Sequence, residues 1–132
     1  MDKVAEEPLM ADILIVEDST AFRQTLKRIV LLRFPSLQIV EAKDGKEAIE
    51  KTSEAPPRLI FMDVSLPGEN GFQLTRKIKA AHPQIPILIM TIYDSQEYRE
   101  TAYDSGADFF LSKKTSTAVD ILTKVESILF PK

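Results

Sequence analysis

The stretch ILIVEDST, residues 13–20, joins four apolar residues directly to two adjacent acids, Glu17 and Asp18. Three of the four apolar residues are β-branched, which favours a β-strand. Adjacent carboxylates repel one another, and ending a buried strand on them costs free energy unless another group compensates for the charge. The role of this acidic pair therefore depends on which groups the fold places beside it.

Short apolar runs recur along the chain and alternate with longer amphipathic segments. The runs that resemble strands are residues 11–17, 37–42, 58–63, 86–91 and 107–112. The first, third and fourth runs are almost continuously apolar, as are parallel strands that are covered on both faces. The second and fifth contain more polar residues, and we predict that they form the edges of the sheet.

The segments between these runs have the apolar spacing of helices. We predict helices over residues 20–34, 45–55, 71–81, 95–104 and 117–130. Ser19 or Thr20 can cap the first helix, Pro35 ends it, and Gly106 suits the position just after the fourth. The alternation predicts an α/β fold: a doubly wound parallel sheet with right-handed crossovers and helices on both faces.

The composition limits the classes of function. The chain has 132 residues, which suits one domain, and its net charge of −3 argues against direct nucleic-acid binding. It contains no cysteine, which excludes disulfides and thiolate metal sites. No apolar run approaches the roughly 20 residues that cross a bilayer. We expect a cytoplasmic protein without membrane contact, with residues 1–10 as a flexible extension and residues 11–132 as the domain.

Ligands of such sheets bind beyond the carboxyl ends of the strands. Glu17 and Asp18 stand at the end of the first strand, Asp63 at the end of the third, Thr91 at the end of the fourth and Lys113 just after the fifth. Clustered carboxylates raise each other's pKa unless a cation joins them, and oxygen ligands without His or Cys favour Mg2+. Asp63 is then a candidate nucleophile for aspartyl-phosphate chemistry.

Four motifs, ILIVEDS, LIFMDVSLPGENG, IPILIMT and SGADFFLSK, resemble those of response-regulator receiver domains of bacterial two-component signalling. The resemblance covers about residues 12–129, and each motif falls at the right strand end in the right order. It implies a flavodoxin-like fold of five parallel strands in the order 2-1-3-4-5, with five helices. It also implies a phosphoacceptor switch, which catalyses only its own phosphotransfer and slow autodephosphorylation.

The resemblance further implies roles at the acidic site. Asp63 matches the phosphoacceptor, and Asp18, Asp63 and the backbone carbonyl of Ser65 match the direct Mg2+ ligands. Glu17 matches a residue that reaches the ion through water, and Lys113 matches the lysine that contacts the phosphoryl group.

A switch surface and partners are also implied. Thr91 and Phe110 match the switch pair, a hydroxyl and an aromatic ring that move on phosphorylation. The expected phosphoryl donor is a phosphohistidine on a sensor histidine kinase or phosphotransfer protein. The surface that responds would comprise helix four, strand five and helix five, through which a homodimer is also expected. The ending KKTS, residues 113–116, resembles regulators that carry a DNA-binding domain, so an output domain beyond this chain is a further expected partner.

Several residues depart from the usual family pattern. Glu17 stands where Asp is common and Phe110 where Tyr is frequent; Ile92 follows Thr91 where a small residue is usual. Lys114 follows Lys113 where many members have a proline with a cis bond, and the sequence leaves that backbone geometry open.

Two other functions remain open at this point. A Mg2+-dependent phosphohydrolase would need a second acid–base group, yet Ser65 stands two residues after Asp63. The other possible function is a binding module that never accepts phosphate. The presence of Glu17, Asp18, Asp63, Thr91 and Lys113 at the strand ends argues against it.

Overall fold

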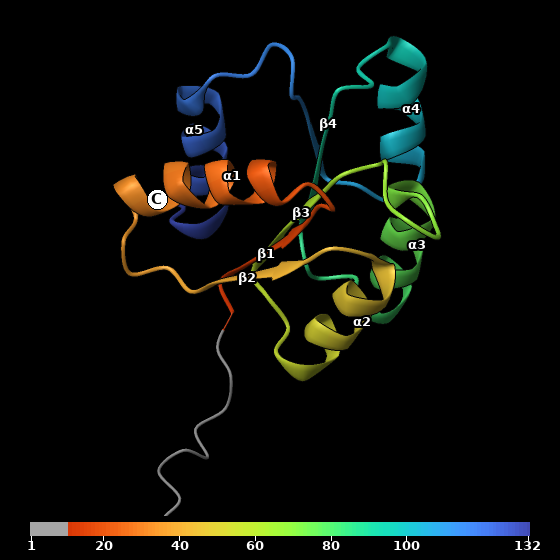
Figure 1. Ribbon diagram of the computed structural model, residues 1–132, viewed down its shortest axis with the longest axis horizontal. Helices are drawn as coiled ribbons and strands as arrows, with labels where there is room; N and C mark the ends of the chain where they lie inside the picture. Colours follow the sequence, from red (N-terminus) through yellow and green to blue (C-terminus); the bar gives the residue numbers. More distant parts are fainter. Residues whose placement is uncertain (1–10) are drawn as a thin grey trace, which may run out of the picture.

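A five-stranded parallel sheet forms the centre of the protein, whose structure is a computed structural model that describes residues 11–132 (Figure 1). The strands are β1 (Ile13–Val16), β2 (Ile39–Ala42), β3 (Leu59–Met62), β4 (Ile87–Thr91) and β5 (Phe109–Ser112). Their order is β2-β1-β3-β4-β5, and every neighbouring pair is parallel. The predicted strand order and the two predicted edge strands are confirmed, whereas the expected flexible extension lies outside the described residues.

Five helices cover the two faces of the sheet. They are α1 (Thr20–Arg33), α2 (Gly45–Glu54), α3 (Gly71–Ala81), α4 (Gln96–Asp104) and α5 (Ala118–Leu129). Helices α1 and α5 lie on one face, and α2, α3 and α4 lie on the other (Figure 1). The doubly wound α/β architecture expected from the alternating pattern is therefore confirmed.

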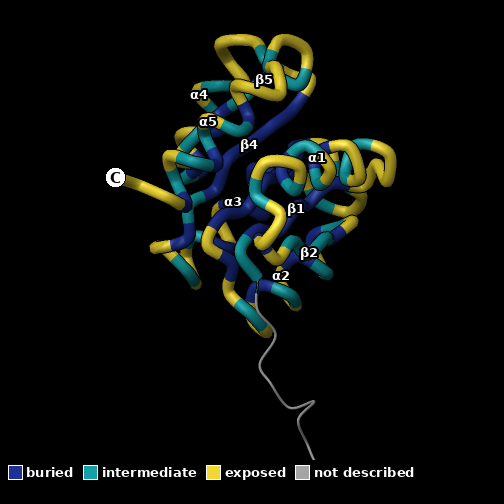
Figure 2. The backbone as a smooth tube through the Cα atoms, turned by 90° about the vertical axis from the view of Figure 1, so that its left-hand side faces the viewer, coloured by how far each residue is buried: buried dark blue, intermediate teal, exposed yellow. Residues whose placement is uncertain are grey.

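Alternate residues of each strand enter two separate cores, as the two-residue period of a strand requires. Leu14 and Val16 pack in the core under α2, α3 and α4, whereas Ile13 and Ile15 pack under α1 and α5. The inner strand β4 is buried along its whole length (Figure 2). Phe110 and Phe109 likewise face opposite cores, and Phe110 is the more buried of the two. The sheet is thus covered on both faces, and its carboxyl edge is left to form a site.

The helix ends follow the local sequence signals. Ser19 caps α1 by accepting a hydrogen bond from Phe22 N at 3.2 Å, and the helix stops at Phe34, before Pro35. Ser95 caps α4, and Gly106 follows it with a φ of 106°, a left-handed conformation that suits glycine. The predicted helix boundaries were correct to within one or two residues.

The strands are shorter than predicted, and the acids lie just beyond them. We predicted that β1 and β3 would include Glu17 and Asp63, but the strands end at the preceding residues. Single backbone hydrogen bonds still hold both acids to the sheet: Glu17 N donates to Ala42 O at 2.9 Å and Asp63 N to Val16 O at 3.0 Å. The acidic residues therefore have a backbone fixed by the sheet and side chains free to turn toward the edge.

Two further findings concern the whole described chain. All peptide bonds of residues 11–132 are trans, including the bond between Lys113 and Lys114. Within the same residues, no helix combines the length and the apolar character that crossing a membrane requires.

Candidate functional site

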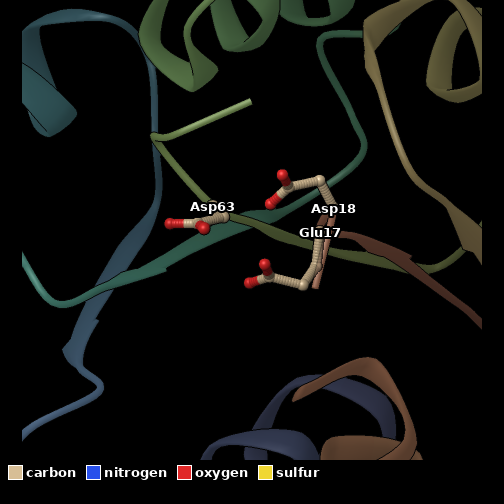
Figure 3. A group of neighbouring side chains, drawn as sticks. All are labelled: Glu17, Asp18 and Asp63. Carbon is tan, nitrogen blue, oxygen red and sulfur yellow. The ribbon is translucent and has the colours of Figure 1, made fainter. Parts of the chain in front are cut away.

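Three carboxylates meet just beyond the ends of β1 and β3 (Figure 3). Glu17, Asp18 and Asp63 each place one carboxylate oxygen within 4.8 Å of the others. Glu17 and Asp63 are buried, whereas Asp18 is exposed. The parallel pairing of β1 with β3 brings these residues together, as the strand-end argument predicted.

The carboxylate of Glu17 uses both of its oxygens. Oε1 accepts a hydrogen bond from Lys113 Nζ at 2.5 Å, and Oε2 accepts one from Ser19 N at 3.0 Å. Burial raises the pKa of the Glu17 carboxyl above its ordinary value, although the hydrogen bonds from Lys113 and Ser19 act in the opposite direction. Glu17 is therefore a buried acid whose charge depends on the lysine beside it.

Lys113 joins the end of β5 to the acidic cluster. Its Nζ atom lies 3.2 Å from Asp63 Oδ2, in addition to its contact with Glu17. The ammonium also lies 4.1 Å from the centre of the Phe22 ring. The Lys113 backbone N–H donates to Thr91 O at 2.9 Å, which ties the β5–α5 loop to the end of β4. The structure thus brings Lys113 into the site where the sequence placed it.

The segment after Asp63 is shaped by a close approach of two backbones. Val64 N donates to Asp63 Oδ1 at 2.8 Å, and Gly71 N donates to Val64 O at 2.8 Å. A Cβ atom at Gly71 would lie 2.1 Å from the carbonyl oxygen of Asp63, so only glycine fits there. Ser65 lies exposed in the turn between Val64 and Gly71.

Thr91 and Phe110 lie on the neighbouring strands β4 and β5. Thr91 is fully buried, and its hydroxyl accepts a hydrogen bond from Tyr93 N at 3.3 Å. Phe110 pairs with Ile89 rather than with Thr91, and Arg99 Cζ lies 4.8 Å from the centre of its ring. The two residues therefore belong to the same side of the molecule, but the strand register does not pair them.

Two residues that contact the site, Arg23 and Phe22, were not among the site residues predicted from the sequence. Arg23 Nη1 donates to the backbone carbonyl of Glu17 at 2.6 Å, while its Nε donates to Glu41 at 2.9 Å. Phe22, which packs against the core under α1 and α5, also lies against the Lys113 ammonium. The contact joins residues far apart in the chain, so no local pattern in the sequence predicts it.

The donor set of the site suits Mg2+. Carboxylate oxygens are hard ligands, and the cluster of Glu17, Asp18 and Asp63 contains neither His nor Cys. Asp18 is exposed and so is accessible to an ion from solvent. The residues present therefore fit this ion, with Glu17, Asp18 and Asp63 as the side chains available to hold it.

Known proteins resemble this chain along most of its length. A family model, the response regulator receiver domain, matches residues 13–126. The transcriptional regulatory protein DegU of Brevibacillus brevis is 29% identical over 126 residues, which make up 91% of this chain and 53% of DegU. The response regulator MprA of Mycobacterium leprae is 32% identical over 117 residues, 89% of this chain and 50% of MprA. The chain thus spans about half the length of these curated relatives.

Solved structures of response regulators also resemble this chain along most of its length. A two-component response regulator from Clostridium difficile superposes with a TM-score of 0.82 and 29% identity, covering 90% of this chain and 95% of that one. A response regulator receiver domain protein from Methanospirillum hungatei has a TM-score of 0.80 and 27% identity, covering 90% and 93%. Together with the family match and the observed strand order, these similarities show that the chain belongs to the response regulator receiver domain family.

Proposed function

We propose that this domain is a phosphorylation-controlled switch in which Asp63 accepts a phosphoryl group from a phosphohistidine. The donor is a sensor histidine kinase or a phosphotransfer protein. The observation that carries the proposal is the placement of Asp63: its buried carboxylate lies 3.2 Å from the Lys113 ammonium, within a cluster of acids at the carboxyl edge of the sheet. A nucleophilic carboxylate beside a fixed cation suits attack on an anionic phosphoryl group.

The two oxygens of Asp63 have different partners, which supports different roles for them in the transfer. Val64 N holds Oδ1, and Oδ2 faces Lys113. In our proposal Oδ2 forms a bond to phosphorus while the phosphorus–nitrogen bond of the donor breaks, and the imidazole leaves with the electron pair. Lys113 then exchanges its contact with Oδ2 for a phosphoryl oxygen, so that positive charge stays beside the group throughout the transfer.

Mg2+ is the proposed cofactor of this transfer. Asp18, Asp63 and the backbone carbonyl of Ser65 would hold the ion directly, and Glu17 would hold it through water. When bound, it would neutralise charge on the transferring phosphoryl group. Both carboxylate oxygens of Glu17 already accept hydrogen bonds, from Lys113 Nζ and from Ser19 N, which supports an indirect role for this residue.

The response to phosphorylation would pass through Thr91 and Phe110. Thr91 would donate its hydroxyl to a phosphoryl oxygen, and α4 with β5 would shift toward a conformation that is already accessible. The affected surface comprises α4, β5 and α5, which we propose as the binding face for a second copy or for an output domain outside this chain. The domain would act in the cytoplasm and would remove its own phosphate slowly, without turning over other substrates.

Labelling of Asp63 tests the proposed function. The protein is incubated with beryllofluoride or with phosphoramidate, each in the presence of Mg2+ or of EDTA. For the phosphoramidate samples, mass spectrometry maps the modified residue. We expect stoichiometric, Mg2+-dependent modification at Asp63 that is lost in Asp63→Asn. Asp104→Asn, which alters an exposed carboxylate at the end of α4, is the matched control and should be modified like the wild type. A wild type that shows no Mg2+-dependent response would refute the proposal.

A further inference from the structure

The Lys113 ammonium has three different neighbours, one of which is an aromatic ring. Glu17 Oε1 lies at 2.5 Å and Asp63 Oδ2 at 3.2 Å, while the centre of the Phe22 ring lies at 4.1 Å. An ammonium within about 6 Å of a ring centre is attracted to the negative face of the ring. The Lys113 side chain is only 13% exposed, so water screens this attraction little.

The Phe22 ring is held in place by the same short segment that carries the acids. Phe22 N donates to Ser19 Oγ at 3.2 Å, and Ser19 N in turn donates to Glu17 Oε2 at 3.0 Å. The ring itself packs against the core under α1 and α5. The backbone hydrogen bond and the contact with this core together place the ring beside the ammonium.

We propose that Phe22 is a positioning residue that holds Lys113 next to Asp63. This inference rests on the proposed function, because Lys113 matters there as the cation beside the phosphoryl group. A lysine side chain has four flexible carbons, and its strongly hydrated ammonium gains hydration by turning to solvent. The contact with the Phe22 ring offsets part of that tendency. Without it, Lys113 would spend a smaller fraction of time beside Asp63.

Variants at Phe22 separate the ring face from simple packing. Leucine keeps an apolar side chain against the core but has no π face, whereas tyrosine keeps both. Phe34→Leu is the matched control: Phe34 is also half-buried and lies at the other end of α1, about 18 Å away along the helix. Melting temperatures of all three variants show whether each one folds.

The first measurement uses the protein without metal or phosphate analogue. Protons on Lys113 Cε that lie over an aromatic ring resonate upfield of their ordinary position in NMR spectra. We expect this upfield shift in the wild type, in Phe22→Tyr and in Phe34→Leu, and its loss in Phe22→Leu. An ordinary Lys113 resonance in the wild type would overturn the inference, whatever the outcome for phosphorylation.

The second measurement is the dissociation constant for beryllofluoride at saturating Mg2+. We expect Phe22→Leu to raise it by about 2- to 30-fold, the range of a cation–π contact, with Phe22→Tyr and Phe34→Leu within about 2-fold of the wild type. Equal affinity for Phe22→Leu and the wild type would overturn the positioning role. Equal weakening in Phe22→Leu and Phe22→Tyr would do the same. A wild type that binds no beryllofluoride would instead refute the proposed function, and the NMR measurement would still decide whether Phe22 holds Lys113.

Discussion

Arg23 shows how a single side chain connects the acidic site to the edge of the sheet. Its guanidinium donates to the backbone carbonyl of Glu17 at 2.6 Å and to the Glu41 carboxylate at 2.9 Å. Gln24 and Lys27 donate to the same carboxylate from α1. Glu41 on β2 is thus the anchor of a small network, and through Arg23 this network holds the chain just before Asp18.

We predict that Glu41→Gln lowers the free energy of unfolding at neutral pH, with an effect that fades in acid. Burial raises the pKa of the Glu41 carboxyl, but hydrogen bonds from Arg23 and Lys27 outweigh burial and hold the pKa below its ordinary value of 4.5. A carboxyl with a lowered pKa in the folded state contributes stability above the unfolded-state pKa, and this contribution is lost as the pH falls through the folded-state pKa. Urea unfolding of both proteins from about pH 7 to about pH 3 measures the difference.

The difference in unfolding free energy should stay constant above about pH 5 and shrink below about pH 4.5. Glu50→Gln, at an exposed position of α2, serves as the control and should cause little change at either pH. A difference between Glu41→Gln and the wild type that grows toward acid would contradict the prediction.

At the scale of elements, contacts between two loops connect the ends of β4 and β5 at the carboxyl edge of the sheet. Ser112 Oγ donates to Asp94 Oδ2 at 2.6 Å, and Lys114 Nζ lies 3.5 Å from Asp94 Oδ1. The hydrogen bond from Ser112 lowers the pKa of the Asp94 carboxyl. Lys114 also donates its backbone N–H to Ser112 Oγ at 3.0 Å, a bond that proline at this position would lack. Lys114 therefore adds a link between the β4–α4 and β5–α5 loops through its contact with Asp94.

The junction of β3 and α3 yields a prediction about Gly71. Because a Cβ atom there would lie 2.1 Å from the Asp63 carbonyl oxygen, Gly71→Ala must push α3 away from the strand end. We expect a loss of about 3 kcal/mol in the free energy of unfolding and weaker beryllofluoride binding. Gly68→Ala is the comparison: its φ of 89° is unfavourable for alanine, but its Cβ meets nothing within 4 Å.

Gly68→Ala should therefore cost only about 1 kcal/mol and leave beryllofluoride binding close to that of the wild type. Chemical denaturation measures both losses. Equal losses for the two glycines would contradict the role assigned to the close approach between Gly71 and the Asp63 carbonyl oxygen.

At the scale of the whole molecule, the site depends on the assembled sheet. Lys113 reaches Glu17 and Asp63 only because β5, β4, β3 and β1 lie side by side in parallel. The carboxylates repel one another, and the single ammonium offsets part of that repulsion in the folded protein. A divalent cation at the same edge should therefore stabilise the fold.

We predict that Mg2+ raises the melting temperature of the wild type and that EDTA reverses the change. Binding to the folded state alone stabilises a protein by about 2.7 kcal/mol when the free ligand is 100-fold above its Kd. Asp18→Asn should remove most of the increase, whereas Asp104→Asn should keep it. Thermal unfolding in Mg2+ is compared with unfolding in sodium chloride of the same ionic strength, which separates binding from screening. An identical melting temperature in the two salts would contradict the prediction.

The sequence by itself determined the elements, their order along the chain and the residues at the strand ends. Apolar periodicity and capping residues act locally, so they predict helices and strands without knowledge of the fold. Placing Glu17, Asp18, Asp63 and Lys113 together needed only the rule that the carboxyl ends of parallel strands share an edge. The roles carried over for these residues, and for Ser65, Thr91 and Phe110, stay predictions until they are measured.

Only the tertiary structure decided which atoms meet at that edge. The Phe22 ring beside Lys113, the Arg23 guanidinium on the Glu17 carbonyl and the missing side chain of Gly71 against Asp63 all depend on separations of a few ångströms. Such separations follow from rotamers and from packing between residues far apart in the chain, which no periodic pattern encodes. The pattern of residues thus placed two carboxylates at the end of a buried strand, whereas the packed molecule determined which cation and which ring lie beside them.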